Sequence, residues 1–376
     1  MSDYDWKKER EKFHTNLTSA ASQKTENANG NFSTADTAGK EIAGKGGLRL
    51  VIAVFLVLLA VGTWIFVSHN SNNSTAAFVK VAEQKKKALG LVVLVIETKD
   101  HQKKVSLPCG TAWAFSDKQF ATNGHVAAGI QETLADFIAN SANELLAQEA
   151  KKNNCQSVDD YLKKLGEQKA EETVKSATQF VISKISSVQA EIIINGTKKQ
   201  SYTVTHVQIH KGYGAVDTKF DPDVAVLTIK EKHDCYFSIA DQKTLGNLKS
   251  GIPVAFLGFP TEGLRQDNVN IDNPIASMQT GIIVAVSDFE MKDAGQSGNF
   301  LIRHNLPATG GASGSPIFNQ KGEVLALLYA GNVIGQINAD GKVQRAPSAA
   351  MINFGVRVDL ISGMAAPVAI EKFLSL

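Results

Sequence analysis

The sequence is poor in cysteine and carries no strong excess of either charge. Its 376 residues include three cysteines, Cys109, Cys155 and Cys235. They are too few and too dispersed for a disulfide scaffold, no two form a CxxC pair, and their pairing stays open. The formal net charge is +2 without a long basic tract, which argues against a general nucleic-acid-binding protein. We therefore expect no metal site, no organic cofactor and no nucleic-acid partner.

The first 46 residues also contain few large apolar side chains. They are dominated by Asn, Ser, Thr, Lys and Glu. Such a segment cannot bury enough apolar surface to offset the entropy that ordering costs. We therefore expect residues 1–46 to form a disordered tail.

One long apolar run follows, over residues 47–67. Its stretch LRLVIAVFLVLLAVGTWIFV is apolar except for Arg49 and Thr63. Twenty helical residues rise roughly 30 Å, which is the thickness of a bilayer core. Basic residues lie before or at the start of the run, and none occurs in the 12 residues after it. The positive-inside rule then places the N-terminus in the cytoplasm.

This pattern predicts a single-pass signal anchor of the bacterial inner membrane. Residues 68–88 would be a polar linker, and the rest of the chain would lie in the periplasm or otherwise outside the cytoplasm. Ser74-Thr75-Ala76 is a passable cleavage site, so a cleaved signal peptide is the alternative.

From Leu89 onward the chain consists mainly of short runs rich in Val, Ile, Phe and Tyr, separated by Gly, Pro, Asn or Asp. About a dozen such runs predict an all-β barrel or sandwich. Asn195-Gly196, between two of the runs, is typical of a hairpin turn. We expect residues 89–376 to form one domain.

Residues 130–188 interrupt the β pattern with a helical period. Apolar residues recur there at spacings of three and four on two faces: Ile130, Leu134, Phe137, Ile138, Leu145 and Leu146, then Val174, Ala177, Val181, Ile185 and Val188. Between them, Ser157 with Asp160 resembles a capping box. We expect a hairpin of two long helices inserted into the β domain. It would be surface decoration, or else a lid, a substrate-docking arm or an oligomerisation element.

Eight histidines are candidates for a catalytic base. Five lie outside the expected folded body or in turn-like contexts where we expect them to be solvated: His14, His69, His101, His210 and His233. Two lie within strand-like runs and are candidates for hydrogen-bonded structural histidines: His206 and His304. His125 differs, because it follows a strand where the chain turns into a small-residue segment that can hold an imidazole at a groove.

An acid and a nucleophile can also be chosen from their contexts. Asp223 precedes the apolar strand VAVLTI, so its carboxylate is placed for partial burial and needs a donor such as an imidazole N–H. Asp221 and Asp217 are its rivals, although Pro222 makes the site of Asp221 more turn-like. Ser313 lies in GGASGS, where glycines permit positive φ and let a substrate carbonyl approach. A base and an orienting acid would make this serine a nucleophile.

In the chain order His125, Asp223 and Ser313, the sequence resembles the trypsin-like (chymotrypsin-fold) serine peptidases rather than the subtilisins or α/β-hydrolases. TNGHVAAG resembles the TNxHV box of bacterial HtrA-type peptidases, DPDVAVLTI their D-x-A-V-L strand, and QTGIIVAV their S-G-I-V strand. ATGGASGSPIFNQKGEV is similar to the serine region of glutamyl-endopeptidase-type members. NFGVRVDLI resembles the final strand of the second barrel. The resemblance covers residues 89–376 except the helical block.

This resemblance implies two six-stranded β-barrels with the active site in the cleft between them. His125 would be the general base and then the general acid, Asp223 would hold its tautomer, and Ser313 would form the acyl-enzyme. The backbone N–H groups of Gly311 and Ser313 would form the oxyanion hole.

Departures from the family pattern carry further expectations. Ala312 lies where digestive members carry Asp, so we expect no zymogen salt bridge. The residues after Ser313 complete the barrel and leave no room for the PDZ domain of many HtrA relatives. The family places the walls of the specificity pocket at Pro307, Ala308, Thr309, Tyr329, Ala330, Gly331 and Gly355. None of these is charged, and Leu328 stands where a glutamyl endopeptidase would carry its Glu-reading histidine, so we expect a preference for a small or medium apolar side chain.

The sequence therefore predicts a membrane-anchored serine endopeptidase that cleaves extracytoplasmic proteins or peptides. The alternative is a binding or sensing module on a peptidase fold, either catalytically silent or held inactive by the helical hairpin. Esterase activity would use the same site. A second copy or another partner would bind through the helical insertion.

Overall fold

The computed structural model describes residues 75–99, 104–197, 200–215, 220–260, 271–307, 309–330, 333–337, 343–347 and 352–375. For residues 330, 333–337 and 343–347 it describes the backbone alone. All of these belong to one compact unit of the chain, residues 64–376. The predicted tail and membrane anchor, residues 1–67, lie outside the described ranges. Within those ranges, no helix is both long and apolar enough to cross a membrane.

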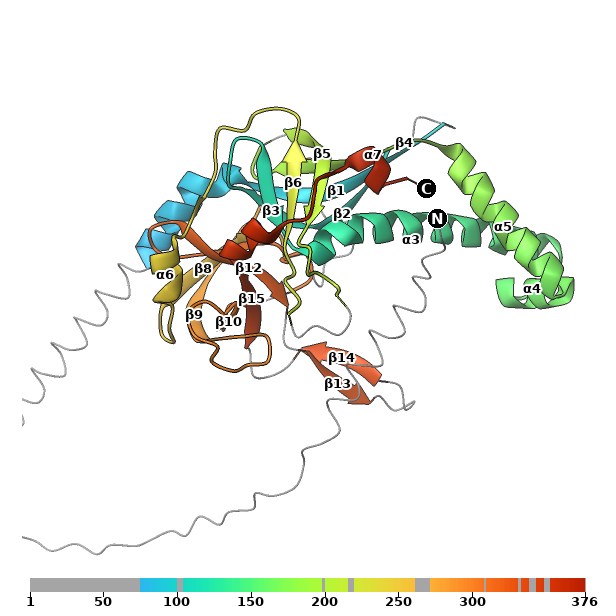
Figure 1. The fold of residues 1–376 in the computed structure, drawn as a ribbon. Coiled ribbons are helices and arrows are strands. Elements are labelled where there is room, and N and C mark those ends of the chain that lie inside the picture. The colour runs from blue at the N-terminus through green and yellow to red at the C-terminus, as the bar shows by residue number, and fades with distance from the viewer. Residues whose placement is uncertain are drawn as a thin grey trace, which may run out of the picture. The chain divides into compact units, whose positions relative to one another are not determined.

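Six antiparallel strands close the first barrel (Figure 1). In the order in which they pair, these are β5 (Ser201–Ile209), β4 (Ile185–Ile194), β1 (Leu89–Thr98), β2 (Lys104–Ala114), β3 (Gln119–Thr122) and β6 (Ala225–Ile229), and β6 pairs again with β5. On β5, Tyr202 and Val204 are buried while Ser201 and Thr203 are exposed. This alternation is typical of a strand with one face on a core.

Six further antiparallel strands close a second barrel. Their order is β11 (Pro316–Phe318), β8 (Pro253–Gly258), β9 (Ser277–Ser287), β10 (Leu301–His304), β15 (Asn353–Arg357) and β12 (Glu323–Ala330), which pairs again with β11. Each barrel also carries one short extra strand, β16 (Val368–Ala369) beside β5 and β7 (Ser238–Ile239) beside β12. The predicted double barrel is therefore confirmed.

A chain of buried aromatic rings joins the two barrels. Trp113 of β2 packs edge-on against Phe237 in the connection between the barrels, with ring centroids 6.0 Å apart. Phe237 lies 5.6 Å from Phe318 of β11, and Phe318 lies 6.0 Å from Phe78 of the helix that covers residues 75–85. Such aromatic pairs contribute about 0.5–1.5 kcal/mol beyond the area they bury. These packed rings hold the two barrels in one relative position. They therefore also hold in place any site that lies between the barrels.

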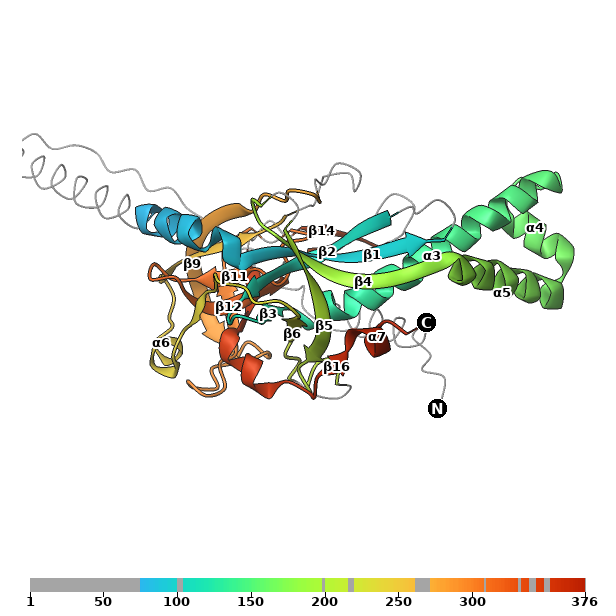
Figure 2. The ribbon, with the colours of Figure 1, turned by 90° about the horizontal axis from the view of Figure 1, so that it is seen from above.

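The helical insertion differs from the expected pair of helices. It contains three, α3 (Gly124–Lys152), α4 (Val158–Leu165) and α5 (Glu167–Lys184), and both views show α4 at the end distant from the strands (Figures 1 and 2). Ser157 accepts a hydrogen bond from Asp160 N at 3.1 Å and so caps α4. Gly166, with φ +81°, separates α4 from α5. Ile185 and Val188, assigned to the second helical stripe, belong instead to β4.

The start of α3 is the more important difference. The small-residue segment after His125, expected to be a turn, is the first part of a helix of 29 residues. Its buried residues lie on one stripe that continues from the barrel into the insertion: Val126, Ala127, Ile130, Leu134, Ile138, Ala142, Leu146 and Ala150. The insertion is therefore a direct extension of the helix that carries His125.

Two smaller hairpins complete the described fold. Asn195 and Gly196 form the β4–β5 turn, as predicted, with Gly196 at φ +64°. The second hairpin, β13 (Val333–Ile337) with β14 (Val343–Pro347), follows β12 and forms a sheet of its own. The short helices α6 (Gln242–Gly246) and α7 (Ile370–Phe373) lie in the connection between the barrels and near the C-terminus.

Candidate active site

His125 and Asp223 meet at the start of α3. Nδ1 of His125 lies 2.6 Å from Oδ2 of Asp223, and the backbone N–H of His125 donates to Oδ1 at 2.8 Å. The side chain of Asn123, directly before α3, donates to the backbone oxygen of Asp223 at 2.8 Å. His125 thus contacts both carboxylate oxygens of Asp223, and its imidazole is held with Nδ1 toward that carboxylate. This arrangement leaves Nε2 as the nitrogen that can act on another group.

The two side chains differ sharply in exposure. The Asp223 side chain is 6% exposed and the His125 side chain 41% exposed. Burial favours the neutral imidazole, but the hydrogen bond and negative charge of Asp223, with the charge of Glu132, outweigh it and raise the pKa of His125. His125 is therefore a stronger base than a free imidazole, with one edge of its ring open.

The wall around Asp223 includes a residue that the sequence did not single out. A Cβ on Gly124 would lie 2.8 Å from Cδ2 of Tyr213 and 3.1 Å from Oδ1 of Asp223, so glycine lets the ring and the carboxylate approach. Burial, then the charges of Asp223 and Asp221, raise the pKa of Tyr213, and its phenol stays neutral. Of the rival acids, Asp221 accepts a bond from Gly214 N at 3.0 Å, and Asp217 lies outside the described residues.

Ser313 lies on a tight loop between β10 and β11 that touches the first barrel. Gly311 and Gly314, on either side of Ser313, have φ +84° and +86°, in the left-handed region that favours glycine. A Cβ on Gly314 would clash with the carbonyl oxygen of Thr111 and with Oγ1 of Thr122. The backbone N–H of Thr111 donates to the Ser313 oxygen at 3.0 Å. The Gly311–Gly314 backbone is therefore shaped by its contact with β2.

The same strand brings Ser313 toward the helix of His125. A Cβ on Gly110 would lie 2.8 Å from Val126, which follows His125, and 3.4 Å from the Ser313 oxygen. The backbone of Ser313 thus lies on the stretch of β2 that also packs against the start of α3, where His125 contacts Asp223. Within the described residues, no hydrogen bond joins His125 to Ser313. Catalytic hydrogen bonds are often long or poorly aligned before substrate binds.

Two backbone donors near Ser313 are free. Among the described residues, no acceptor pairs with the N–H of Gly311 or of Ser313, whereas Ala312 N donates to Thr309 O and Gly314 N to Leu328 O. Unpaired N–H groups separated by one residue on a turn suit a developing oxyanion.

The predicted pocket residues are described only in part. Ala308 and Gly331 lie outside the described residues, and Ala330 is described by its backbone alone. Burial, followed by the charges of Asp223 and Asp221, raises the pKa of Tyr329 to about 12. Gly355 faces the barrel interior, since a Cβ there would lie 2.8 Å from Ile317.

Two histidines expected to be solvated are buried. His210 is 6% exposed, and its Nδ1 accepts a hydrogen bond from Gly212 N at 3.0 Å. His233 is 4% exposed and packs against the rings of Phe120 and Tyr202. The turn-like flanking residues misled the prediction, because distant segments help to cover both rings: Phe120 and Tyr202 pack on His233, and His210 forms an isolated β-bridge with Met364. Burial lowers the pKa of both rings, so neither competes with His125 as the stronger base.

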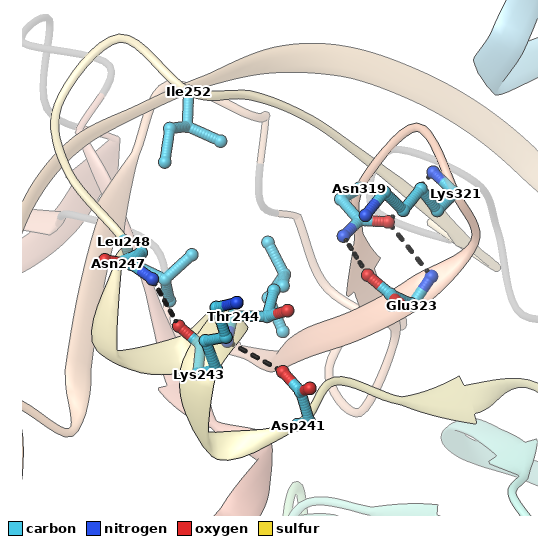
Figure 3. Close-up of a pocket in the computed structure, with 10 residues that line it drawn as sticks. Asp241, Lys243, Thr244, Asn247, Leu248, Ile252, Asn319, Lys321 and Glu323 are labelled. Atoms are coloured by element: carbon cyan, nitrogen blue, oxygen red, sulfur yellow. Dashed lines mark hydrogen bonds between the residues drawn. The ribbon is translucent and has the colours of Figure 1, made fainter.

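A surface cavity of about 470 Å³ lies away from these residues, between α6 and the β11–β12 turn (Figure 3). Asp241 accepts from Thr244 N at 2.7 Å, and Asn319 donates to Glu323 at 2.7 Å, so its polar walls are largely self-paired. None of His125, Asp223 and Ser313 lines it. Across the described part of the chain, no group of three His, Cys, Asp or Glu side chains could hold a metal ion.

The comparison with protein families agrees with the fold. A family profile described as a trypsin-like peptidase domain matches residues 110–327, more than half of the chain. Among solved structures, the chain is similar to the HtrA-type protease AlgW with a decapeptide, at 13% identity and TM-score 0.41, over 75% of this chain and 64% of that one. It is also similar to the Rv3671c protease from M. tuberculosis in its active form, at 13% identity and TM-score 0.38, over 75% and 81%. The match thus spans less than two thirds of the AlgW chain. No curated protein matches the sequence.

Proposed function

Because the chain belongs to the trypsin-like peptidase family, we propose that it is a serine endopeptidase in which Ser313, His125 and Asp223 carry the reaction. The observation that carries the proposal is the contact of both Asp223 carboxylate oxygens with His125, beside the glycine-bounded loop of Ser313. A buried acid that fixes one imidazole nitrogen leaves the other available to a serine hydroxyl.

The proposed reaction proceeds through an acyl-enzyme. Oγ of Ser313 forms a bond to the substrate carbonyl carbon while Nε2 of His125 takes the hydroxyl proton. The peptide C–N bond then breaks, and His125 returns the proton to the leaving amine. Water repeats the sequence on the ester, which releases the carboxylic acid and restores Ser313. Asp223 stays ionised and keeps Nδ1–H of His125 in place throughout.

The oxyanion would be held by the N–H groups of Gly311 and Ser313. Their lack of a protein acceptor within the described residues supports this role. One such donor contributes about 10²–10³ in rate. The substrate side chain before the cleaved bond would be small or medium and apolar, because no predicted pocket residue is charged and Leu328 replaces the Glu-reading histidine.

The substrates would be extracytoplasmic proteins or peptides. This follows from the apolar run 47–67, which we propose anchors the chain in a bacterial inner membrane with the peptidase domain outside the cytoplasm. Alkaline phosphatase fused after Leu376 should then be active, and a cytoplasmic reporter fused there should be inactive. The reverse pattern would overturn the orientation, and release of the domain from washed membranes would favour the cleaved form.

A second candidate is a peptidase fold that is silent or held inactive by its helices. It is favoured by the lack of a hydrogen bond between His125 and Ser313, together with the continuity of α3 from His125 into the insertion. Replacing residues 147–170 with a short Gly-Ser linker removes α4 and the helix ends beside it. Activity that appears only after this deletion would identify an autoinhibitory insertion, and unchanged activity would make it decoration or a docking arm for a partner or second copy.

The proposed endopeptidase is tested with a library of fluorescence-quenched peptides and with casein, and the products identified by mass spectrometry. Wild-type protein should cleave internal peptide bonds, and Ser313→Ala should not. Ser315→Ala is the matched control, since Ser315 is a fully buried serine two residues away. Equal activity of wild type and Ser313→Ala would overturn the proposal, and hydrolysis of esters without peptides would make the protein an esterase.

A further inference from the structure

Thr111 makes more contacts with the Ser313 loop than its place in an apolar strand suggests. It is fully buried on β2 of the first barrel. Its hydroxyl donates to the Gly311 oxygen at 2.9 Å and accepts from Phe259 N at 3.2 Å. Its backbone N–H donates to the Ser313 oxygen at 3.0 Å. A threonine hydroxyl has one proton to donate, so these two roles are compatible.

These bonds act on the peptide planes around the nucleophile. A trans peptide keeps its C=O and N–H antiparallel, so fixing one end of a plane fixes the other. The Gly311–Ala312 plane is held by Thr111 Oγ1 at its oxygen and by Thr309 O at its N–H. The Ser313–Gly314 plane is held by Thr111 N at its oxygen and by Leu328 O at its N–H.

The plane between them is held at one end only. The oxygen of Ala312 accepts from Ser315 N at 3.1 Å, and the N–H of Ser313 has no acceptor within the described residues. With both neighbouring planes fixed, the direction of this free N–H is set by the loop. Thr111 supplies the oxygen-side bond of both fixed planes.

We propose that Thr111 is a positioning residue that sets the direction of the Ser313 N–H, one of the two oxyanion donors, before substrate binds. The proposal rests on the proposed function of Ser313. The hydroxyl does not touch the substrate: it ties the oxygen of Gly311 to β2 and, through Phe259 N, to the end of β8. Without it, the Gly311–Ala312 plane loses one of its two bonds, and the neighbouring plane that carries the Ser313 N–H is held less firmly.

The test compares side chains at position 111 that have a hydroxyl with side chains of similar size that lack one. Thr111→Val keeps the shape of Thr, and Thr111→Ala and Thr111→Ser differ from each other only in the hydroxyl. We expect Thr111→Val and Thr111→Ala to lower kcat about 10- to 100-fold and to change KM less than about twofold. This fall in kcat is smaller than the ~10²–10³ expected when an oxyanion donor is deleted. Thr111→Ser should recover most of kcat. Thr205→Val, which removes another Thr hydroxyl bond of the first barrel, to Thr228 O, should leave kcat unchanged.

A second readout separates positioning from general loosening. A peptide boronic acid forms a tetrahedral adduct with the serine, so its affinity for the Thr111 variants should fall in parallel with kcat. A substrate-like peptide is then measured against the same variants on a Ser313→Ala background. Its affinity should be about equal in all of them. The proposal is overturned if Thr111→Val keeps wild-type kcat, if Thr111→Ser is as impaired as Thr111→Ala, or if both ligands weaken equally. Wild-type activity distinguishes these outcomes from failure of the proposed function, which would show as an inactive wild type or an active Ser313→Ala.

Discussion

The two halves of the candidate site are held in different ways. In the first barrel, side chains do the positioning: both oxygens of the Asp223 carboxylate accept from His125, and the Asn123 amide holds the Asp223 backbone. In the second barrel, peptide groups are positioned, and Gly311 and Gly314 adopt φ values near those of a left-handed turn. The His125–Asp223 half is built within one barrel, whereas the loop of the proposed nucleophile, Ser313, takes its shape from contact with the other.

The difference follows from what each half has to present. A base needs one ring orientation and one tautomer, which a carboxylate can fix. An oxyanion site needs backbone N–H groups at set angles, which only the peptide planes can fix. A change of chemistry at Asp223 should therefore damage the first half, and a single carbon added to Gly314 should damage the second.

The largest effect is expected from the acid. Asp223→Asn keeps the shape but cannot hold Nδ1–H, so kcat should fall about 10⁴-fold. Asp221→Asn is the matched control, since Asp221 accepts one bond from Gly214 N and should change kcat less than about threefold. Steady-state kinetics on one fluorogenic peptide compares them. Equal losses in the two variants would show that the acid has been misassigned.

The nucleophile half is broken by one methyl group. Gly314→Ala places a Cβ against the Thr111 oxygen and Thr122 Oγ1 at φ +86°, and we expect about 3 kcal/mol or more of destabilisation. Gly196→Ala has a similar φ, +64°, with no atom within 4 Å, and should cost about 1 kcal/mol. Urea denaturation measures both free energies of unfolding. Similar values for the two variants would mean that the Ser313 loop is not packed on β2.

The acid–base half should also set the pH dependence. Only the neutral imidazole can take the Ser313 proton, and the pKa of His125 is raised by Asp223. The protonated, inactive form therefore persists to higher pH, and kcat/KM should rise with a midpoint above the ordinary value of about 6.5. The residual activity of Asp223→Asn should have a lower midpoint. A midpoint unchanged by this substitution would separate Asp223 from the titrating group.

The smallest effect is expected at the far end of α3. Ser157→Ala removes the cap of α4 and should cost about 1 kcal/mol of local stability, seen as faster hydrogen exchange in residues 158–165. Because α4 has no fully buried residue, kcat should not change. A change in kcat would show that α4, at the far end of the insertion, influences His125 and Asp223.

The sequence predicted the barrels and the acid–base pair because both have local signals. Strand runs and the glycines around the serine can be read within a few residues, and the order His125, Asp223, Ser313 can be read directly along the chain. The helical start of α3 was missed although Ala127 and Ala128 are strong helix formers, because Gly124 and Gly129 are poor ones and the segment follows a strand directly. The contacts of Thr111 with Gly311 and Phe259 span 200 and 148 residues, and no local pattern marks them.

The central claim is that Ser313 is the nucleophile activated by His125 across the two barrels. The direct measurement is reaction of the full chain with a fluorophosphonate, followed by proteolysis and mass spectrometry of the adduct. We predict one adduct, on Ser313, that forms at least about 10³-fold more slowly in His125→Ala. An adduct on Ser315 or on another serine, labelling that is as fast without His125, or no labelling of the wild type would contradict the account.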